Sequence, residues 1–211
     1  MRILALSIVL VLMPVSLYAS GRSEPTGLAA RVAQLEAQVA AMEEILQYVH
    51  VETEEVNGLA GPHWIIEGAN VHVRSGSGNT PDFCTFTDPE FPSCESLTGL
   101  GNLIVGYNEF LRSQPPNMPL NIRTGSHNLI LGRFHSYSSF AGLVAGSSNR
   151  ITGPYASVSG GSNNVASGDF SSVSGGHSNE ARGSTSSVSG GADREALDAE
   201  NWAAGSLFES N

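Results

Sequence analysis

Residues 157–161 read Ser-Val-Ser-Gly-Gly, and the same five letters return fifteen residues later at 172–176 and again at 187–191. One asparagine and one further glycine of each copy keep the same step, at Asn149, Asn164, Asn179 and at Gly153, Gly168, Gly183. A short fixed period is typical of solenoids, in which each repeat forms one coil that stacks on the coil before it. The sequence therefore predicts a mainly β fold, a parallel β-roll or β-solenoid of about 15-residue repeats over residues 62–200.

The alternation within one copy predicts which side chains face the inside of a coil. Neighbouring residues of a strand face opposite sides, so Val158 should point inward while Ser157 and Ser159 point outward. A second short strand is expected at residues 164–166 of the same coil. The expected inward core positions are Leu143, Val158, Val173 and Val188.

The glycines that end each copy mark the corners of the coils. Glycine adopts positive φ without steric cost, and asparagine tolerates the same backbone region. The expected corner glycines are Gly146, Gly161, Gly176 and Gly191.

One irregular step interrupts the period. The corresponding glycines Gly106 and Gly132 lie 26 residues apart, which is one repeat plus eleven residues, and residues 113–119 have the composition of a loop. We therefore expect an inserted loop at residues 110–122, and a second one at the proline-rich residues 79–98. Insertions in solenoids form loops on one face, which is often the binding face.

The N-terminus has the features of a secretory signal peptide. Arg2 precedes an apolar run over residues 3–13, and Ala19 is a suitable cleavage position. Residues 1–19 are therefore expected to direct the chain to the cell surface or the outside, the alternative being an uncleaved anchor. An apolar run of this length is too short to cross a bilayer, and no integral membrane anchor is expected elsewhere.

The chain contains two cysteines, Cys84 and Cys94. In a secreted chain an even pair predicts a disulfide. The alternative, a pair of metal ligands, is disfavoured because the spacing is far from Cys-x-x-Cys and no histidine lies between them.

Apolar residues repeat at alternating steps of four and three residues before the roll. One position of this heptad holds Leu28, Leu35, Met42 and Val49, and the other holds Val32, Val39 and Leu46. This spacing is the seam of a coiled coil, and it predicts a short coiled-coil helix over residues 27–56. The alternative is a single amphipathic helix that packs on its own domain.

Composition argues against some partners, and the phase of the apolar residues argues against disorder. The formal net charge is −10 and all ten basic residues are arginine, so neither nucleic acid nor an anionic membrane is an expected partner. The richness in Gly, Ser and Asn also fits a disordered chain. The fixed phase of the apolar residues argues against disorder, because a disordered tract has no need of phase.

A thin coil stack is expected to need partners. Each fifteen-residue repeat offers about one valine and one alanine for burial, which is little against the entropy lost on ordering the backbone. Association through a further face of every coil would add burial, and the heptad indicates self-association as well.

The repeat resembles the head of trimeric autotransporter adhesins, the YadA-like head. The resemblance rests on residues 143–146, Leu-Val-Ala-Gly, and on 157–161 with its two successors. It implies a left-handed parallel β-roll, three chains packed side by side as a homotrimer, and a coiled-coil stalk. The string Gly-Asn-Leu-Ile-Val-Gly-Tyr-Asn-Glu at 101–109, with 125–128, is also similar to uncharacterised secreted bacterial proteins, which implies bacterial origin.

The chain departs from this family in two respects. The heptad precedes the roll, whereas the adhesins place the stalk after the head. Residues 201–211 do not alternate like strands of a membrane barrel, and they are expected to cap the last coil instead.

No constellation of residues predicts an enzyme, a cofactor or a metal site. The sequence lacks a Gly-x-Ser-x-Gly elbow, and the repeat itself explains the serines. Asp169 and Glu180 are isolated, whereas glycosidase chemistry needs a facing pair. His127, His135 and His177 share no repeat phase and are expected in exposed loops, although symmetry could gather three copies of one of them around a metal.

Aromatic residues near the inserted loop form the candidate ligand face. They are Tyr107, Phe110, Phe134, Tyr137 and Phe140. Aromatic side chains supply contact area with a polar handle, but these could equally pack inside the wider coils. A ladder formed by Ser157, Ser172 and Ser187 could present regular hydroxyls to a ligand or simply be a solvated face.

Together these features predict a non-enzymatic secreted or cell-surface protein, adhesin-like or structural, whose oligomeric β-roll presents a binding surface. A glycan or an extracellular-matrix protein is the expected kind of ligand. Two alternatives stay open: a secreted solenoid enzyme that degrades polysaccharide, and a passive spacer of an extracellular matrix or filament.

Overall fold

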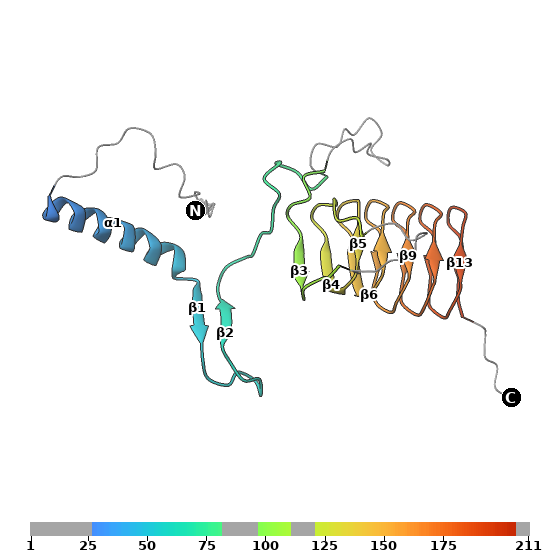
Figure 1. The fold of residues 1–211 in the computed structure, drawn as a ribbon, viewed down its shortest axis with the longest axis horizontal. Coiled ribbons are helices and arrows are strands. Elements are labelled where there is room, and N and C mark those ends of the chain that lie inside the picture. The colour runs from blue at the N-terminus through green and yellow to red at the C-terminus, as the bar shows by residue number, and fades with distance from the viewer. Residues whose placement is uncertain (1–26, 82–96, 111–120, 206–211) are drawn as a thin grey trace, which may run out of the picture. The chain divides into compact units, whose positions relative to one another are not determined.

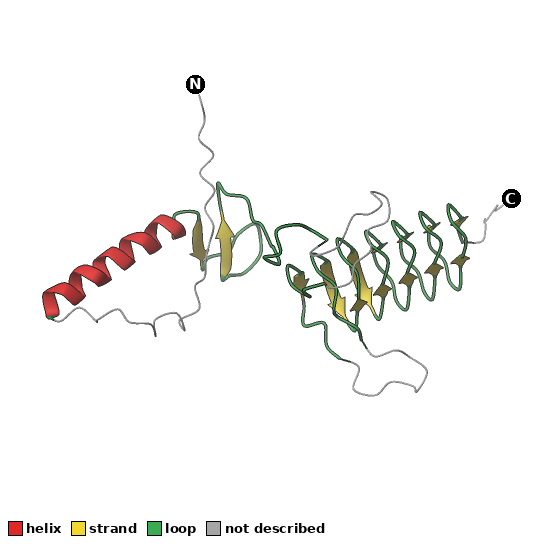
Figure 2. Ribbon diagram, turned by 90° about the horizontal axis from the view of Figure 1, so that it is seen from above, coloured by secondary structure: helices red, strands yellow, loops and turns green. Residues whose placement is uncertain are grey.

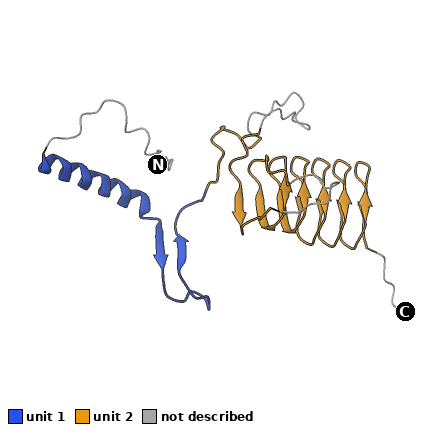
Figure 3. Cartoon of the chain, in the orientation of Figure 1, with its two compact units in different colours: residues 1–71 blue, residues 72–211 orange. Residues whose placement is uncertain are grey.

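The computed structural model describes residues 27–81, 97–110 and 121–205, which belong to two compact units, residues 1–71 and 72–211 (Figure 3). The predicted signal peptide and the cysteine pair Cys84 and Cys94 lie outside the described residues, as do most of the loop predicted at 110–122 and the end of the predicted cap.

The described part of the first unit, residues 27–71, holds one helix and a two-stranded antiparallel sheet (Figure 1). Helix α1 spans Leu28–Leu46, and strands β1 (Val49–Glu52) and β2 (His63–Ile66) pair with Val49 opposite Ile66. The predicted helix to residue 56 is therefore too long. The sequence Val-His-Val at 49–51 suits a strand, and pairing with β2 satisfies its backbone.

The second unit is a parallel β-solenoid of about five turns, built from two sheets (Figures 1 and 2). The first sheet contains β3 (Leu103–Val105), β4 (Leu129–Arg133), β6 (Leu143–Ser147), β8 (Ser157–Val158), β10 (Ser172–Val173), β12 (Ser187–Val188) and β14 (Trp202–Ala203). The second sheet contains β5 (Ser136–Tyr137), β7 (Arg150–Ile151), β9 (Val165–Ala166), β11 (Glu180–Ala181) and β13 (Glu195–Ala196).

The register confirms the fifteen-residue repeat. Ser172 lies between Ser157 and Ser187 in neighbouring strands. The irregular step also keeps the register, because Leu103 pairs with Leu129 across it. Trp202 pairs with Ser187, so residues 202–203 add a further rung to the first sheet before any cap begins.

The core of the regular coils consists of small apolar side chains that stack in register from one coil to the next. The first sheet contributes Val144, Val158, Val173 and Val188, and the second contributes Ile151, Ala166, Ala181 and Ala196, all at most 1% exposed. One expected core position is wrong. Leu143 pairs with Ser157 on the outer face and is only partly buried, whereas Val144 takes the inward position opposite Val158.

Residues 71–74, Val-His-Val-Arg, alternate between apolar and polar side chains as a strand does, but they form no strand in the described chain. The segment that follows instead binds the first coil. The main-chain N–H of Ser75 donates to His127 Nε2 at 3.0 Å, and His127 Nδ1 lies 2.7 Å from the carbonyl oxygen of Thr80.

Candidate functional site

The phased asparagines form a hydrogen-bonded ladder inside one corner of the roll. Asn149 Oδ1 accepts from the main-chain N–H of Asn164 at 2.8 Å, and Asn164 Oδ1 accepts from that of Asn179 at 2.9 Å. Asn164 Nδ2 also donates to the carbonyl oxygens of Gly160 and Gly176, both at 3.1 Å. All three asparagines are at most 1% exposed. Their side chains therefore connect successive coils. The sequence predicted only that these asparagines tolerate the backbone conformation of a corner.

His135 continues this asparagine ladder toward the N-terminus. Its Nδ1 lies 3.3 Å from the main-chain N of Asn149, and its Nε2 lies 3.1 Å from the carbonyl oxygen of Leu131. An amide N–H requires an acceptor and a carbonyl requires a donor, so the ring is neutral and carries its proton on Nε2. The imidazole thereby reproduces two contacts of an asparagine amide, the bond to the carbonyl four residues before it and the bond from the next ladder residue.

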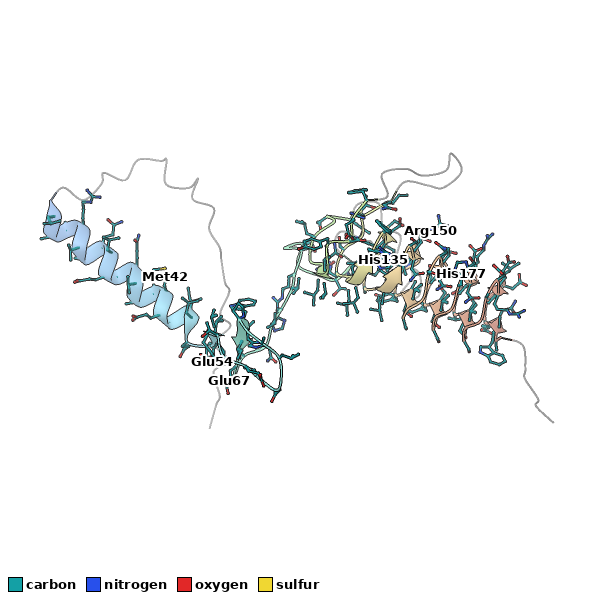
Figure 4. All side chains as sticks on the ribbon, turned by 60° about the horizontal axis from the view of Figure 1, so that its bottom comes forward. Met42, Glu54, Glu67, His135, Arg150 and His177 are labelled. Atoms are coloured by element: carbon teal, nitrogen blue, oxygen red, sulfur yellow. The ribbon has the colours of Figure 1, made fainter. Side chains whose placement is uncertain are left out.

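The expectation that the three histidines occupy exposed loops is wrong for His135, which is fully buried and shares the asparagine phase (Figure 4). Its Nδ1 acceptor role is the role of an asparagine Oδ1. His127 is partly buried against the segment at 75–80, and exposed His177 lies 3.0 Å from Ser162 Oγ.

Acid should weaken the roll through His135. Burial lowers the pKa of this imidazole, and the guanidinium of Arg123, which donates to the His135 carbonyl at 3.4 Å, lowers it further. Because the folded-state pKa lies below the unfolded value of about 6.5, the contribution to stability is complete above that pH. It falls as the pH falls toward the folded pKa, by at most about 1.4 kcal/mol per pH unit.

The His135→Asn variant should therefore lose part of this acid sensitivity, because an amide keeps both hydrogen bonds and cannot be protonated. Urea unfolding between pH 7.5 and pH 5 would measure the difference, with His177→Asn as the exposed control. An unchanged pH slope in His135→Asn would refute the assignment.

The five candidate aromatic residues do not form one ligand face. Tyr137 is 4% exposed and Phe140 is fully buried, so both belong to the interior, whereas Tyr107 is 92% exposed. The guanidinium carbon of Arg123 lies 3.9 Å from the ring centroid of Phe110, and Arg133 covers partly buried Phe134 at 5.1 Å. Tyr137 takes the inward position of β5, because it lies in register with buried Ile151 of β7.

A different aromatic row follows the opposite corner. The rings of Phe140 and Tyr155 meet edge to face at 5.1 Å, and those of Tyr155 and Phe170 stack at 4.9 Å with planes 6° apart. Stacking turns the ring faces toward each other, so this row stabilises the corner and offers a ligand mainly ring edges.

The outer face of the first sheet changes character along the roll. At the N-terminal end it is apolar, and this apolar outer face consists of Leu103, Val105, Leu129, Leu131 and Leu143, whereas Ala145, in register with Leu131, is buried. Further along it becomes the serine face, which consists of Ser157, Ser159, Ser172, Ser174, Ser187 and Ser189. The row ends at Trp202, which is 66% exposed and whose indole N–H donates to Ser189 Oγ at 2.7 Å.

The second sheet carries charge on its outer side. The successive outward positions are Arg150, Val165, Glu180 and Glu195, so three of the four are charged, and Arg182 forms an ion pair with Glu180 at 2.6 Å. Among the described residues, no three His, Cys, Asp or Glu side chains gather in an arrangement that could hold a metal ion.

Comparisons of the chain with protein-family models, with curated proteins and with solved structures each found no match. The solenoid is compatible with a β-roll, and the resemblance to the YadA-like head rests on the sequence motifs. Within the described part of the chain, no helix has the length and apolar character needed to cross a membrane.

Proposed function

We propose that the chain is a non-enzymatic secreted or cell-surface protein of adhesin-like type, whose β-rolls assemble as a homotrimer and present a binding surface. The observation that carries this proposal is apolar surface that the single chain leaves open, on α1 and on the first coils of the roll.

The helix supports self-association most directly. None of the residues of α1, which the structure describes throughout, is buried. The heptad side chains Leu35, Val39 and Met42 are 58%, 47% and 52% exposed, and Figure 4 labels Met42 on the helix. A seam of apolar residues at steps of four and three is covered when parallel copies of the helix pack together.

The apolar outer face supports association of the rolls as well. Leu103 and Val105 are 50% and 56% exposed at its N-terminal end. Contiguous apolar surface of this kind marks interfaces in soluble proteins. A second copy is a suitable partner, because a symmetric assembly would cover the helix and the first coils together.

Substituting the seam should dissociate the assembly. The Leu35→Glu/Met42→Glu double variant places like charges at facing positions of every helix pair, and it should shift the mass in analytical ultracentrifugation from three chains toward one. The matched control, Glu36→Gln/Glu43→Gln, changes neighbouring non-seam positions and should keep the oligomer. A wild-type chain that sediments as a compact monomer would refute self-association, and a dimer or tetramer would refute the trimer alone.

One observation favours the enzyme alternative. Burial raises the pKa of Asp169, as a general acid for glycoside hydrolysis requires. A screen for reducing-sugar release from polysaccharides decides between the two functions. Activity that Asp169→Asn abolishes would favour the enzyme. The spacer alternative would be supported if the oligomer bound no glycan or matrix protein on arrays.

A further inference from the structure

We propose that the serine face and Trp202 together form a binding site for a neutral, extended polysaccharide chain. The inference rests on the proposed role as a binding protein and assigns a place and a ligand class to that role. It does not depend on the oligomeric state.

The serine face offers side-chain hydroxyls in two parallel rows. The backbone groups beneath the hydroxyls are already hydrogen-bonded between strands. The N–H of Ser159 donates to the carbonyl oxygen of Val173 at 3.0 Å, and that of Ser174 donates to the carbonyl oxygen of Val188 at 2.9 Å. Ser159, Ser174 and Ser189 are exposed. A ligand would therefore meet hydroxyl groups, each of which can donate and accept a hydrogen bond.

The face is uncharged in a chain with a formal net charge of −10. No ionisable side chain occupies an outward position of β8, β10, β12 or β14, all of which lie in the described part of the roll. The outer side of the second sheet differs, because Arg150, Glu180 and Glu195 stand there. Electrical neutrality beside hydroxyl rows matches a neutral sugar chain better than a charged glycan or a peptide with charged side chains.

Trp202 supplies an apolar platform at the end of the rows. Its register partner is Ser187, so the indole replaces a serine on the same face. The hydrogen bond to Ser189 Oγ at 2.7 Å holds the ring against the preceding rung, and 66% of the residue stays exposed. Sugar rings have C–H faces and hydroxyl edges, and an aromatic ring fixed beside hydroxyl groups complements both.

The dimensions of the site suit an extended chain. Parallel strands lie about 4.8 Å apart, so the three steps from Ser157 to Trp202 span about 14 Å, the length of about three linked sugar rings. One border of the face is open. A Cβ built on Gly160, Gly175 or Gly190 meets no atom of the described chain within 4 Å. A flat β-1,4-linked chain could therefore lie on the face and continue past its edge.

Fluorescence of Trp202 can test the proposal, because the chain has two tryptophans. In the full chain carrying Trp64→Phe, Trp202 is the sole indole reporter. Titration with cellohexaose and with chitohexaose should change its emission saturably for at least one of them, whereas an oligogalacturonate of equal length should not. Saturable emission changes with neither neutral probe would overturn the proposal.

Variants locate the site. Trp202→Ala should weaken binding to the retained probe about tenfold or more, as measured by calorimetry, and Ser189→Ala should weaken it less by releasing the ring. Trp64→Ala is the matched control, since Trp64 is 71% exposed in the other unit and should not affect binding.

Two results would contradict the proposal while leaving the proposed function intact. Trp202→Ala could bind as wild type with an unchanged circular dichroism spectrum, which would place the ligand elsewhere. It could instead dissociate the oligomer in ultracentrifugation, which would make the face a contact between copies. An unfolded Trp202→Ala would be replaced by Trp202→Phe, which keeps a smaller platform and should bind with intermediate affinity; wild-type affinity would again refute the site.

Discussion

Replacing Gly161 with alanine should destabilise the roll by about 3–5 kcal/mol, whereas the same change at the adjacent Gly160 should alter stability by less than about 1 kcal/mol. Gly161 has φ of 74°, in the left-handed region, which alanine enters at a cost of about 1–2 kcal/mol. The larger part of the effect comes from the neighbouring coil. A Cβ on Gly161 would collide with the carbonyl oxygen of Gly176, and it would lie 2.7 Å from the Gly176 nitrogen and 2.9 Å from Asn164 Nδ2.

Relief of this collision requires the coils to separate, and separation breaks the bonds that join them. The main-chain N–H of Ser162 donates to the carbonyl oxygen of Gly176 at 2.9 Å, and Asn164 Nδ2 donates to the same carbonyl oxygen at 3.1 Å. Gly160 is a matched control because a Cβ there meets no described atom within 4 Å. Urea unfolding followed by circular dichroism would compare the two variants. A loss for Gly161→Ala as small as that for Gly160→Ala would show that the corner tolerates a side chain there and would refute the close contact with Gly176.

The pair Gly160 and Gly161 explains why the sequence predicts the period correctly but places Leu143, instead of Val144, in the core. The step of fifteen residues from Gly146 to Gly161 predicts Leu143 as the counterpart of Val158 in the core. The Ser-Val-Ser-Gly-Gly copies contain one more glycine than Leu-Val-Ala-Gly, and the extra residue lies in the corner. In the strands Val144 therefore pairs with Val158 at a step of fourteen. Periodicity alone cannot tell whether an added residue extends a strand or a turn.

The sequence pattern did not identify the positions of His135 and Trp202. The ladder position of His135 could not be recognised from residue type, because an imidazole replaces an amide there by matching one acceptor and one donor. Trp202 belongs to residues 201–211, which the sequence predicts as a cap, yet its backbone continues the first sheet. The pattern of valines and serines was sufficient for the remaining rungs, because one face of each short strand is fully buried.

The largest effect is expected for Val173→Asp, which should abolish the folded roll and the assembly of rolls with it. Val173 is fully buried and lies in register between Val158 and Val188. The substitution removes about 1.5–3 kcal/mol of apolar burial. It also places a carboxyl group in a file of valine and alanine side chains, where burial without a partner costs several kcal/mol more.

Val173→Asp is more destabilising because Val173 lies in the middle of the stack of coils. In a solenoid each coil is stabilised by its two neighbours, so the loss of the β10 rung uncouples β8 on one side and β12 on the other. Ser174→Asp is the control, because the adjacent side chain is exposed on the serine face and its charge stays in water. Circular dichroism and ultracentrifugation should show an unfolded roll for Val173→Asp and a folded oligomer for Ser174→Asp. The reverse outcome would mean that the serines face inward, and it would invert both the core and the proposed binding face.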